Sequence, residues 1–295
     1  MQTLSRIPQD WPLRAASRVI RCRPHDWHVQ VTGAGPDVLA LHGAGASGHS
    51  FHPLIPHLPG FRHILPDLPG QGFTRAGGMF RLGLDPMAED LAALCADQGW
   101  RPVAIIGHSA GAAVALRLAE LLTEGPRAVI GINAALAPFE GLAGWLYPKL
   151  AKAMAASPLM GAVVTRLAAK RRQVEALLQR TGSTLPPERA ALYQRLVSDP
   201  RHVDGTLGMM AQWDLAPLLG RLAEMTVPTL LIAADGDRAV PAQVSRTAAA
   251  RMPCAIFAGI GGLGHLAHEE APEAVAALAL PYLQARCAPL AVVSR

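Results

Sequence analysis

The chain has 295 residues, of which 51% are apolar and 17% are charged, and its formal net charge is +5. This composition excludes a disordered chain, because it supplies enough apolar side chains for a large core. Of the 27 basic residues only Lys149, Lys152 and Lys170 are lysine, and no basic stripe with interleaved aromatic residues occurs. We therefore expect no nucleic-acid partner, and the length predicts one large α/β domain with an insertion.

The four cysteines indicate a reducing compartment, because none of them forms a CxxC pair or lies near another in the sequence. They are Cys22, Cys95, Cys254 and Cys287. The first ten residues lack the apolar segment of a signal peptide, and no run is suited to span a membrane. We expect a cytoplasmic protein, for which peripheral contact with a membrane stays open.

The first half of the chain alternates short apolar runs with segments of helical period. Residues 1–25 are polar and arginine-rich, and we expect them to be irregular. Strands are predicted at residues 27–31, 38–41, 63–67, 102–106 and 128–132, and helices at residues 87–98 and 112–122. Strands that alternate with helices predict a mostly parallel sheet with helices on both faces.

The alternation stops between residues 137 and 225, where the pattern predicts helices and no strand. The predicted helices span residues 148–156, 160–180 and 188–197. The alternation then resumes with a strand at 227–234, a helix at 242–251, a strand at 255–257 and a helix at 272–285. We therefore assign residues 1–136 and 226–295 to the core and residues 137–225 to a helical cap, or lid, over the ligand crevice.

The most informative stretch of the core is Gly107-His108-Ser109-Ala110-Gly111, between a predicted strand and a predicted helix. The pattern G-x-S-x-G in this setting is typical of a nucleophile elbow, which presents a serine on a strained turn. The turn brings the strand and the helix close together, and both demands favour glycine.

Two further residues complete a catalytic triad in the chain order Ser, Asp, His that this architecture uses. Asp237 follows the strand that ends at residue 234, and His265 follows the strand at 255–257. Parallel strands bring both residues to the same sheet edge as Ser109, which would attack an acyl carbon. His265 would take its proton, and Asp237 would hold the imidazole. The backbone N–H groups of Ala44 and Ala110 are the predicted oxyanion donors.

Each partner of Ser109 has a rival in the sequence. Asp235 competes with Asp237 but lies closer to the strand end and its turn. His268 competes with His265, but it begins a predicted helix whose first turn contains Glu269 and Glu270, which we interpret as complements of the helix dipole. The position after strand 128–132 holds Asn133, which cannot serve as the acid.

Other polar residues of the core are interpreted as structural. His42 and His108 flank tight turns and are expected to brace them with hydrogen bonds, and Asp67 is expected to pin a turn at a strand end. The remaining histidines lack metal-ligand spacing, so we expect no metal site. The glycine loops are too short for a nucleotide motif and no Walker lysine occurs, so we expect no cofactor.

Five motifs together resemble those of the α/β-hydrolase-fold superfamily. They are Leu41-His42-Gly43, residues 67–72, residues 107–111, residues 237–241 and Gly264-His265. The resemblance implies a mostly parallel central sheet, helices on both faces and an inserted helical lid. Gln71 departs from the superfamily pattern, in which histidine is common at this position, and we attach no mechanistic consequence to it.

A second resemblance covers nearly the whole chain. The chain is similar to the BchO family of magnesium-chelatase accessory proteins, which are encoded with bacteriochlorophyll biosynthesis in phototrophic bacteria. The similarity lies in residues 11–12, 16–18, 27–30, 45–47, 49–50, 67–70, 72–74, 107–113, 181–184, 208–211, 213–215 and 264–272. It implies a place in magnesium insertion into protoporphyrin, or in the handling of tetrapyrroles around that step, without supplying a reaction.

Two functional hypotheses follow, with a small acyl or tetrapyrrole compound as ligand and magnesium chelatase subunits as candidate partners. The first is a serine hydrolase for an ester, thioester or similar acyl bond. The second is a non-catalytic accessory protein that holds a porphyrin under the lid. Cofactor-free haloperoxidase or C–C cleavage chemistry is a third, weaker alternative.

The second hypothesis depends on side chains of the lid. Its basic residues could pair with propionates, although a solvated helix face is the commoner use of such a run. Met209 and Met210 near Trp213 could line a flat pocket or pack in the core. The basic residues are Arg166, Lys170, Arg171, Arg172 and Arg180.

Overall fold

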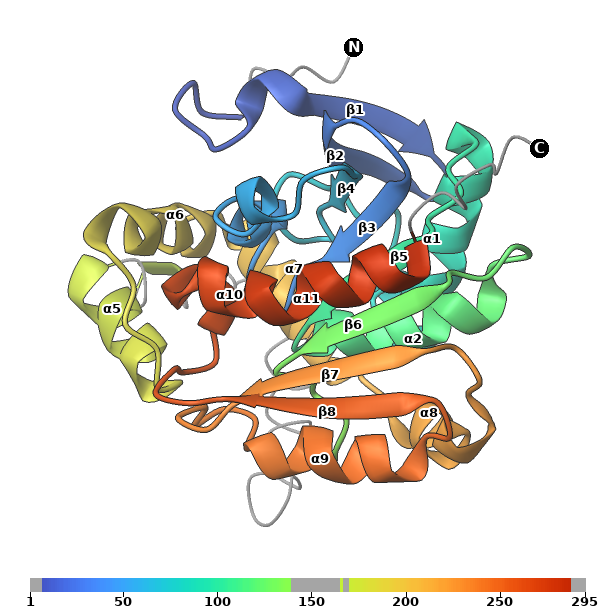
Figure 1. The fold of residues 1–295 in the computed structure, drawn as a ribbon. Helices are drawn as coiled ribbons and strands as arrows, with labels where there is room; N and C mark the ends of the chain where they lie inside the picture. Colours follow the sequence, from blue (N-terminus) through green and yellow to red (C-terminus); the bar gives the residue numbers. More distant parts are fainter. Residues whose placement is uncertain (1–6, 139–164, 167–169, 288–295) are drawn as a thin grey trace.

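The computed structural model describes residues 7–138, 165–166 and 170–287. Its centre is an eight-stranded sheet in the order β1-β2-β4-β3-β5-β6-β7-β8 (Figure 1). Strand β2 pairs antiparallel with β1 and β4, and the remaining pairs are parallel. The strands are β1 (Ser17–Cys22), β2 (His25–Gly33), β3 (Asp37–Leu41), β4 (Arg62–Pro66), β5 (Ala104–His108), β6 (Ala128–Ile132), β7 (Thr229–Ala234) and β8 (Ala255–Ile260).

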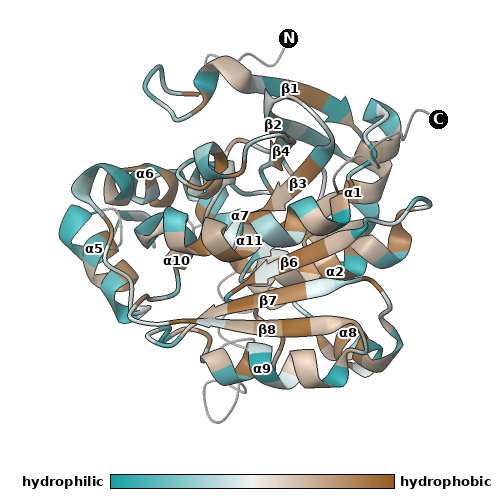
Figure 2. Ribbon diagram, in the orientation of Figure 1, coloured by the Kyte–Doolittle hydropathy of each residue, from teal (hydrophilic) through white to brown (hydrophobic). Residues whose placement is uncertain are grey.

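The central strands are short and apolar because both of their faces are covered. Every residue of β3, β5, β6 and β7 is buried, and the hydropathy colouring shows apolar central strands beneath more polar helices (Figure 2). Successive side chains of a strand point to opposite faces. Accordingly, Leu39 and Leu41 join one apolar cluster, and Val38 and Ala40 join another on the opposite face.

Helices from different parts of the chain cover the two faces. Residues of α1, α2 and α9 pack in the first cluster, and residues of α10 and α11 in the second. The helices of the core are α1 (Leu84–Gln98), α2 (Ala110–Leu121), α8 (Ala216–Gly220), α9 (Ala242–Arg251), α10 (Ala267–Glu270) and α11 (Pro272–Cys287). Short 3-10 turns are η2 (Arg14–Ala16), η3 (Gly48–Phe51), η4 (Ile55–His57), η5 (Met79–Arg81) and η6 (Leu222–Glu224).

Between β6 and β7 the described part of the chain contains helices and no strand. These helices are α5 (Arg171–Arg180), α6 (Pro187–Val197), α7 (Pro200–Ala211) and the short α8. The α7 backbone lies against the core, because a Cβ on Gly205 would collide with the carbonyl oxygen of Gly70. The predicted helix 148–156 and part of the predicted helix 160–180 lie outside the described residues, and the cap boundaries at 137 and 225 remain a prediction.

Two features differ from the sequence-based expectation. Residues 17–22 form β1, so the expectation of an irregular stretch over residues 1–25 is wrong there. Arg18 and Arg21 of this edge strand are exposed, whereas Ile20 and Cys22 face the core. Helix α7 was not predicted, because Gly205 and Gly208 weaken its helical propensity. No helix within the described residues is long and apolar enough to cross a membrane.

Candidate active site

Ser109 lies on a strained turn between β5 and α2. Its φ of 53° and ψ of −119° are unusual for a residue with a Cβ. Its N–H donates to the carbonyl of Ile132 at 3.0 Å, which ties the turn to the neighbouring strand. A Cβ at Gly107 would collide with the backbone of Gly111, and a Cβ at Gly111 would collide with the carbonyl of Leu41. The glycines therefore permit the close packing that exposes the serine.

His265 and Asp237 form a hydrogen-bonded pair at the same sheet edge. The distance from His265 Nδ1 to Asp237 Oδ2 is 2.7 Å, and Asp237 Oδ1 accepts from the N–H groups of Ala239 and Val240 at 2.8 Å each. Because a carboxylate only accepts, Nδ1 carries the proton and Nε2 is left as a proton acceptor. Asp235 accepts instead from Gly262 N at 2.7 Å, so the structure pairs His265 with Asp237 and not with its rival.

The backbone of His265 is braced from two directions. Its carbonyl accepts from His108 Nε2 at 2.9 Å and from Asn133 Nδ2 at 2.8 Å. The Asn133 side-chain oxygen accepts from Ala234 N at 2.8 Å, so this residue links two strand ends. The prediction that His108 braces a turn is confirmed. For Asn133 the sequence excluded an acid but did not reveal this bracing role, because the contact spans more than a hundred residues.

His268, the rival base, lies behind the elbow with no exposed surface. Its ring lies 4.4 Å from the ring of His108, and burial lowers its pKa to about 3. Neither of its ring nitrogens has a hydrogen-bond partner within the described residues. A neutral, inaccessible imidazole is poorly suited to take the serine proton, and the geometry therefore favours His265.

The segment that follows α5, which belongs to the predicted cap, holds both the acid and the base loops. The carbonyl of Thr181 accepts from Arg238 N at 3.0 Å and from His265 N at 3.3 Å. Ser183 Oγ accepts from Leu266 N at 2.8 Å. The sequence did not identify Thr181 and Ser183 as residues that hold these loops. The available signal was the motif at residues 181–184, which contributed only to the resemblance.

Glu269 connects α6 to the short helix α10 beside the base loop. It lies in the first turn of α10, as predicted, but it is fully buried, and burial raises its pKa to about 8. Tyr193 of α6 donates its hydroxyl to Glu269 Oε1 at 2.5 Å, and the Arg189 guanidinium donates to the Glu269 carbonyl. Complementing a helix dipole is therefore an incomplete account of this carboxyl group.

The two predicted oxyanion donors flank Ser109. Ala110 is the first residue of α2, so its N–H has no acceptor within the helix and lies at the positive end of the helix dipole. Ala44 belongs to the turn 43–46, which Ala46 N closes by donating to Gly43 O at 3.2 Å. A Cβ built on Gly43 would lie 3.1 Å from the Ser109 Cβ, which places this turn directly against the elbow.

Buried polar side chains support the turn 43–46. His42 donates from Nδ1 to Gly43 O at 2.8 Å and accepts at Nε2 from Leu68 N at 2.8 Å, which confirms the prediction that it braces a turn. Gln71 accepts from Gly45 N at 2.7 Å. Gln71, to which the sequence attached no mechanistic consequence, thus contacts this turn, and the sequence could not reveal a contact made through the loop backbone.

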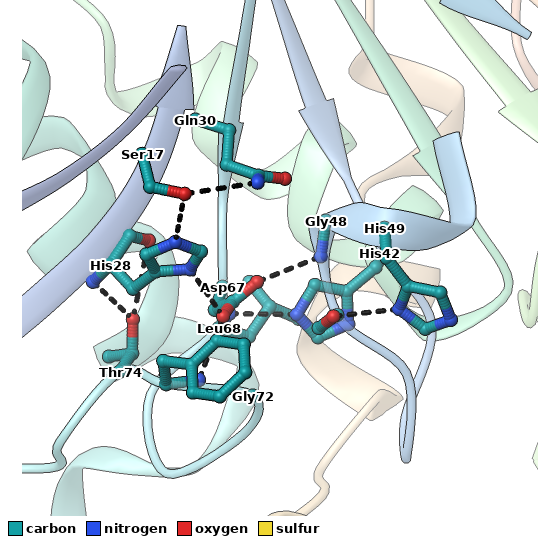
Figure 3. A network of polar contacts seen from close by, with 12 residues as sticks. Ser17, His28, Gln30, His42, Gly48, His49, Asp67, Leu68, Gly72 and Thr74 are labelled. Atoms are coloured by element: carbon teal, nitrogen blue, oxygen red, sulfur yellow. Dashed lines mark hydrogen bonds and ion pairs between the residues drawn. The ribbon is translucent and has the colours of Figure 1, made fainter. Parts of the chain in front are cut away.

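Asp67 is the centre of a buried network next to this turn (Figure 3). It accepts from Gly48 N at 2.8 Å and Phe73 N at 2.8 Å, and it contacts His28 Nδ1 at 2.7 Å. Burial by itself would raise the pKa of Asp67, but His28 and the other donors more than offset it and lower the value to about 2. The prediction that Asp67 pins a turn is confirmed.

A cavity of about 740 Å³ lies at the seam between α7 and the loop that follows β4. Ser109, Asp237 and His265 do not line it. Within the described residues, no group of three or more histidine, cysteine, aspartate or glutamate side chains is arranged to hold a metal ion. The residues that line the cavity are Gly70, residues 72–76, Met79, Leu82, Asp199, Arg201, His202, Asp204 and Gly205.

The fold and this site define the class of protein. A family model described as alpha/beta hydrolase fold matches residues 36–272, and the chain therefore belongs to that family. Within it, the chain falls in the BchO-type group: it is 49% identical to the magnesium-chelatase 30 kDa subunit of Rhodobacter capsulatus, over 94% of this chain and 98% of that protein.

Esterases are more distant relatives of the chain. It is 30% identical to the pimeloyl-[acyl-carrier protein] methyl ester esterase of Xanthomonas oryzae pv. oryzae, over 81% of this chain and 91% of that protein. The solved structure of an esterase from Exiguobacterium antarcticum superposes with a TM-score of 0.73 at 18% identity, and covers 88% of this chain and 96% of that one. This structural likeness shows the shared fold.

Proposed function

We propose that the chain is a serine hydrolase that cleaves an ester or a similar acyl bond through Ser109, His265 and Asp237. The observation that carries the proposal is the 2.7 Å contact between His265 Nδ1 and Asp237 Oδ2 at the sheet edge where Ser109 lies on a strained turn. Ser109 is half-buried and 11% of the His265 side chain is exposed, and this residual exposure supports the proposal.

The proposed reaction has two stages. Ser109 Oγ attacks the acyl carbon while His265 Nε2 takes its proton, and the carbonyl oxygen gains negative charge. The N–H groups of Ala110 and Ala44 stabilise that charge. The tetrahedral intermediate collapses, His265 protonates the departing alcohol, and an acyl group remains on Ser109. A water molecule, deprotonated by His265, then releases the acid and restores the serine.

The substrate class of the proposal comes from the relatives. One is named as a subunit of magnesium chelatase and another as a methyl ester esterase. We infer that the acyl bond is an ester carried by a magnesium tetrapyrrole or its precursor, in bacteriochlorophyll biosynthesis. The chain would then act in the cytoplasm near magnesium chelatase.

Labelling of Ser109 tests the hydrolase. Folded protein is treated with a fluorescent alkyl phosphonate, and the labelled peptide is identified by mass spectrometry. We expect label on Ser109, none in Ser109→Ala, and much slower labelling in His265→Ala. A panel that includes methyl esters of magnesium protoporphyrin then defines the substrate. Absence of label from the native chain, together with full biological activity of Ser109→Ala, would rule out the hydrolase.

A binding role without catalysis is the second candidate, and the name of the relative at 49% identity favours it. The lid cations give it little support: Arg166, Lys170, Arg172 and Arg180 are exposed, and Arg171 pairs with Glu175 at 2.8 Å. Met209 is buried in the core cluster. Titration of Ser109→Ala with protoporphyrin and its magnesium form tests this role. A shift of the pigment absorbance at micromolar concentration is expected, and an unchanged spectrum contradicts it.

A further inference from the structure

Each of the three successive peptide groups in the turn that contains Ala44 is held by a different buried side chain. The Gly43 carbonyl accepts from His42 Nδ1 at 2.8 Å. The Gly45 N–H donates to Gln71 Oε1 at 2.7 Å, and the Gly45 carbonyl accepts from His202 Nε2 at 3.2 Å. His42 and Gln71 belong to the core, whereas His202 belongs to α7 of the cap.

These contacts determine where the Ala44 N–H points. In a trans peptide the C=O and the N–H lie in one plane and point in opposite directions. The hydrogen bond that fixes the Gly43 carbonyl therefore also fixes the direction of the Ala44 N–H. Gln71 holds the next peptide plane and His202 the one after it. A change in the direction of the Ala44 N–H would therefore break buried hydrogen bonds.

His202 is suited to this task at neutral pH. It is 2% exposed, and its Nδ1 accepts from Gly72 N at 2.9 Å, so the proton of the neutral ring lies on Nε2, which faces the Gly45 carbonyl. Burial lowers its pKa to about 4. The ring therefore stays neutral and bridges two core loops from the cap.

Gln71 is held by the same helix. It is fully buried, and because its Oε1 accepts from Gly45 N, its amide nitrogen points to Met209, whose sulfur lies 3.1 Å away. Helix α7 thus supplies both His202 and Met209. The contact of Gly205 with Gly70 brings α7 close enough for these bonds.

We propose that His202 and Gln71 are positioning residues that hold the oxyanion loop 43–46, and that the cap helix α7 controls this loop through them. The inference rests on the proposed hydrolase function, because it assigns an oxyanion role to Ala44. Displacement of α7 would release the Gly45 carbonyl and loosen the loop. Movement of the cap would then be coupled to catalysis through the loop 43–46.

Three variants test the proposal. His202→Phe and Gln71→Leu replace each polar side chain by an apolar one of similar size and remove its hydrogen bond to Gly45. Gln212→Leu is the matched control, because Gln212 follows α7 and bonds the core at the Met79 carbonyl at 2.5 Å but does not touch Gly45. The first readout is hydrogen exchange at the amides of residues 43–46. We expect at least tenfold faster exchange there in both test variants and little change in the control.

The second readout separates a misplaced oxyanion donor from general damage. It is the ratio of kcat/KM for a p-nitrophenyl ester to that for the matching thionoester, whose sulfur accepts hydrogen bonds poorly. We expect kcat on the ester to fall about 10- to 100-fold, below the loss for a deleted donor, with KM nearly unchanged. The ratio should fall in His202→Phe and Gln71→Leu and stay constant in Gln212→Leu.

The two readouts test different parts of the proposal. Unchanged exchange at residues 43–46 in both test variants overturns the positioning role, whatever the activity. Faster exchange with an unchanged ester-to-thionoester ratio overturns the link to the oxyanion. If exchange rises but the native chain shows no turnover that depends on Ser109, the proposed hydrolase function fails while the hold of α7 on the loop stands.

Discussion

Two histidine–aspartate pairs in this chain share the same short contact, and only one of them lies at the candidate active site. The distance from Nδ1 to Oδ2 is 2.7 Å both for His265–Asp237 and for His28–Asp67. His28 Nε2 also lies 3.0 Å from Ser17 Oγ. Distances alone would therefore qualify Ser17, His28 and Asp67 as a triad.

The surroundings of the two pairs differ. The side chain of His28 is 1% exposed, whereas that of His265 is 11% exposed. Ser17 lies on β1 with ordinary strand pairing, and Gln30 donates to its hydroxyl at 3.1 Å. Within the described residues no helix begins at Ser17, whereas Ser109 directly precedes α2, whose first N–H is the proposed oxyanion donor. Short distances within a triad thus show only how its side chains are oriented. An active site also needs access for a substrate and donors for the oxyanion.

Replacing each serine gives the largest expected contrast. Ser109→Ala should lower ester hydrolysis by at least about 10⁴-fold, because the nucleophile is lost. Ser17→Ala should leave the rate within about threefold and cost about 1 kcal/mol of unfolding free energy for a lost hydrogen bond. Initial rates and thermal unfolding measure both effects. Phosphonate label on Ser17 would contradict the contrast.

The two aspartates should separate activity from stability. Asp237→Asn should reduce kcat about 10⁴-fold, since an amide favours the wrong tautomer of His265, with little loss of stability. Asp67→Asn should cost about 2–4 kcal/mol of unfolding free energy, because it leaves buried donors poorly satisfied. Urea denaturation and steady-state kinetics, run where both variants are folded, measure the two losses. Equal effects of both substitutions on kcat would remove the distinction.

Acid unfolding should report Asp67. Its pKa in the folded chain, about 2, lies below the ordinary value of 3.8. The folded state therefore binds fewer protons there than the unfolded state, and the stability due to this carboxylate is complete above pH 3.8 and lost as pH falls toward 2. We expect the decline in melting temperature over this window to be shallower in Asp67→Asn. Identical slopes would show that another group dominates.

A buried carboxyl without a histidine partner should behave in the opposite way. The pKa of Glu269 in the folded chain, about 8, exceeds the ordinary 4.5, so folding is progressively disfavoured as pH rises from 4.5 to 8. Glu269→Gln should remove this dependence and raise the melting temperature a few degrees at pH 8. Tyr193→Phe, which deletes the hydroxyl donor, should lower it. A melting temperature of Glu269→Gln below the native value at pH 8 would contradict this account.

Sequence patterns predicted best where the physical signal is local. The runs at residues 38–41 and 128–132 lie in β3 and β6, because strands buried on both faces need continuous apolar residues. Glycines and a serine at residues 107–111 predicted the elbow, because the residues of a tight turn are adjacent in the sequence. Strand β1 was missed because its arginines hide the alternation, and α7 because glycines lower its propensity.

The sequence by itself determined the fold family, the elbow and the order of Ser109, Asp237 and His265, since all three follow from strand ends and turn chemistry. Only the tertiary structure decided that Asp237 and not Asp235 meets His265, and that His28–Asp67 is a structural pair. It alone revealed that His202 of α7 contacts the Gly45 carbonyl. Such contacts join residues far apart in the chain, and nothing in the local pattern encodes which distant groups will meet.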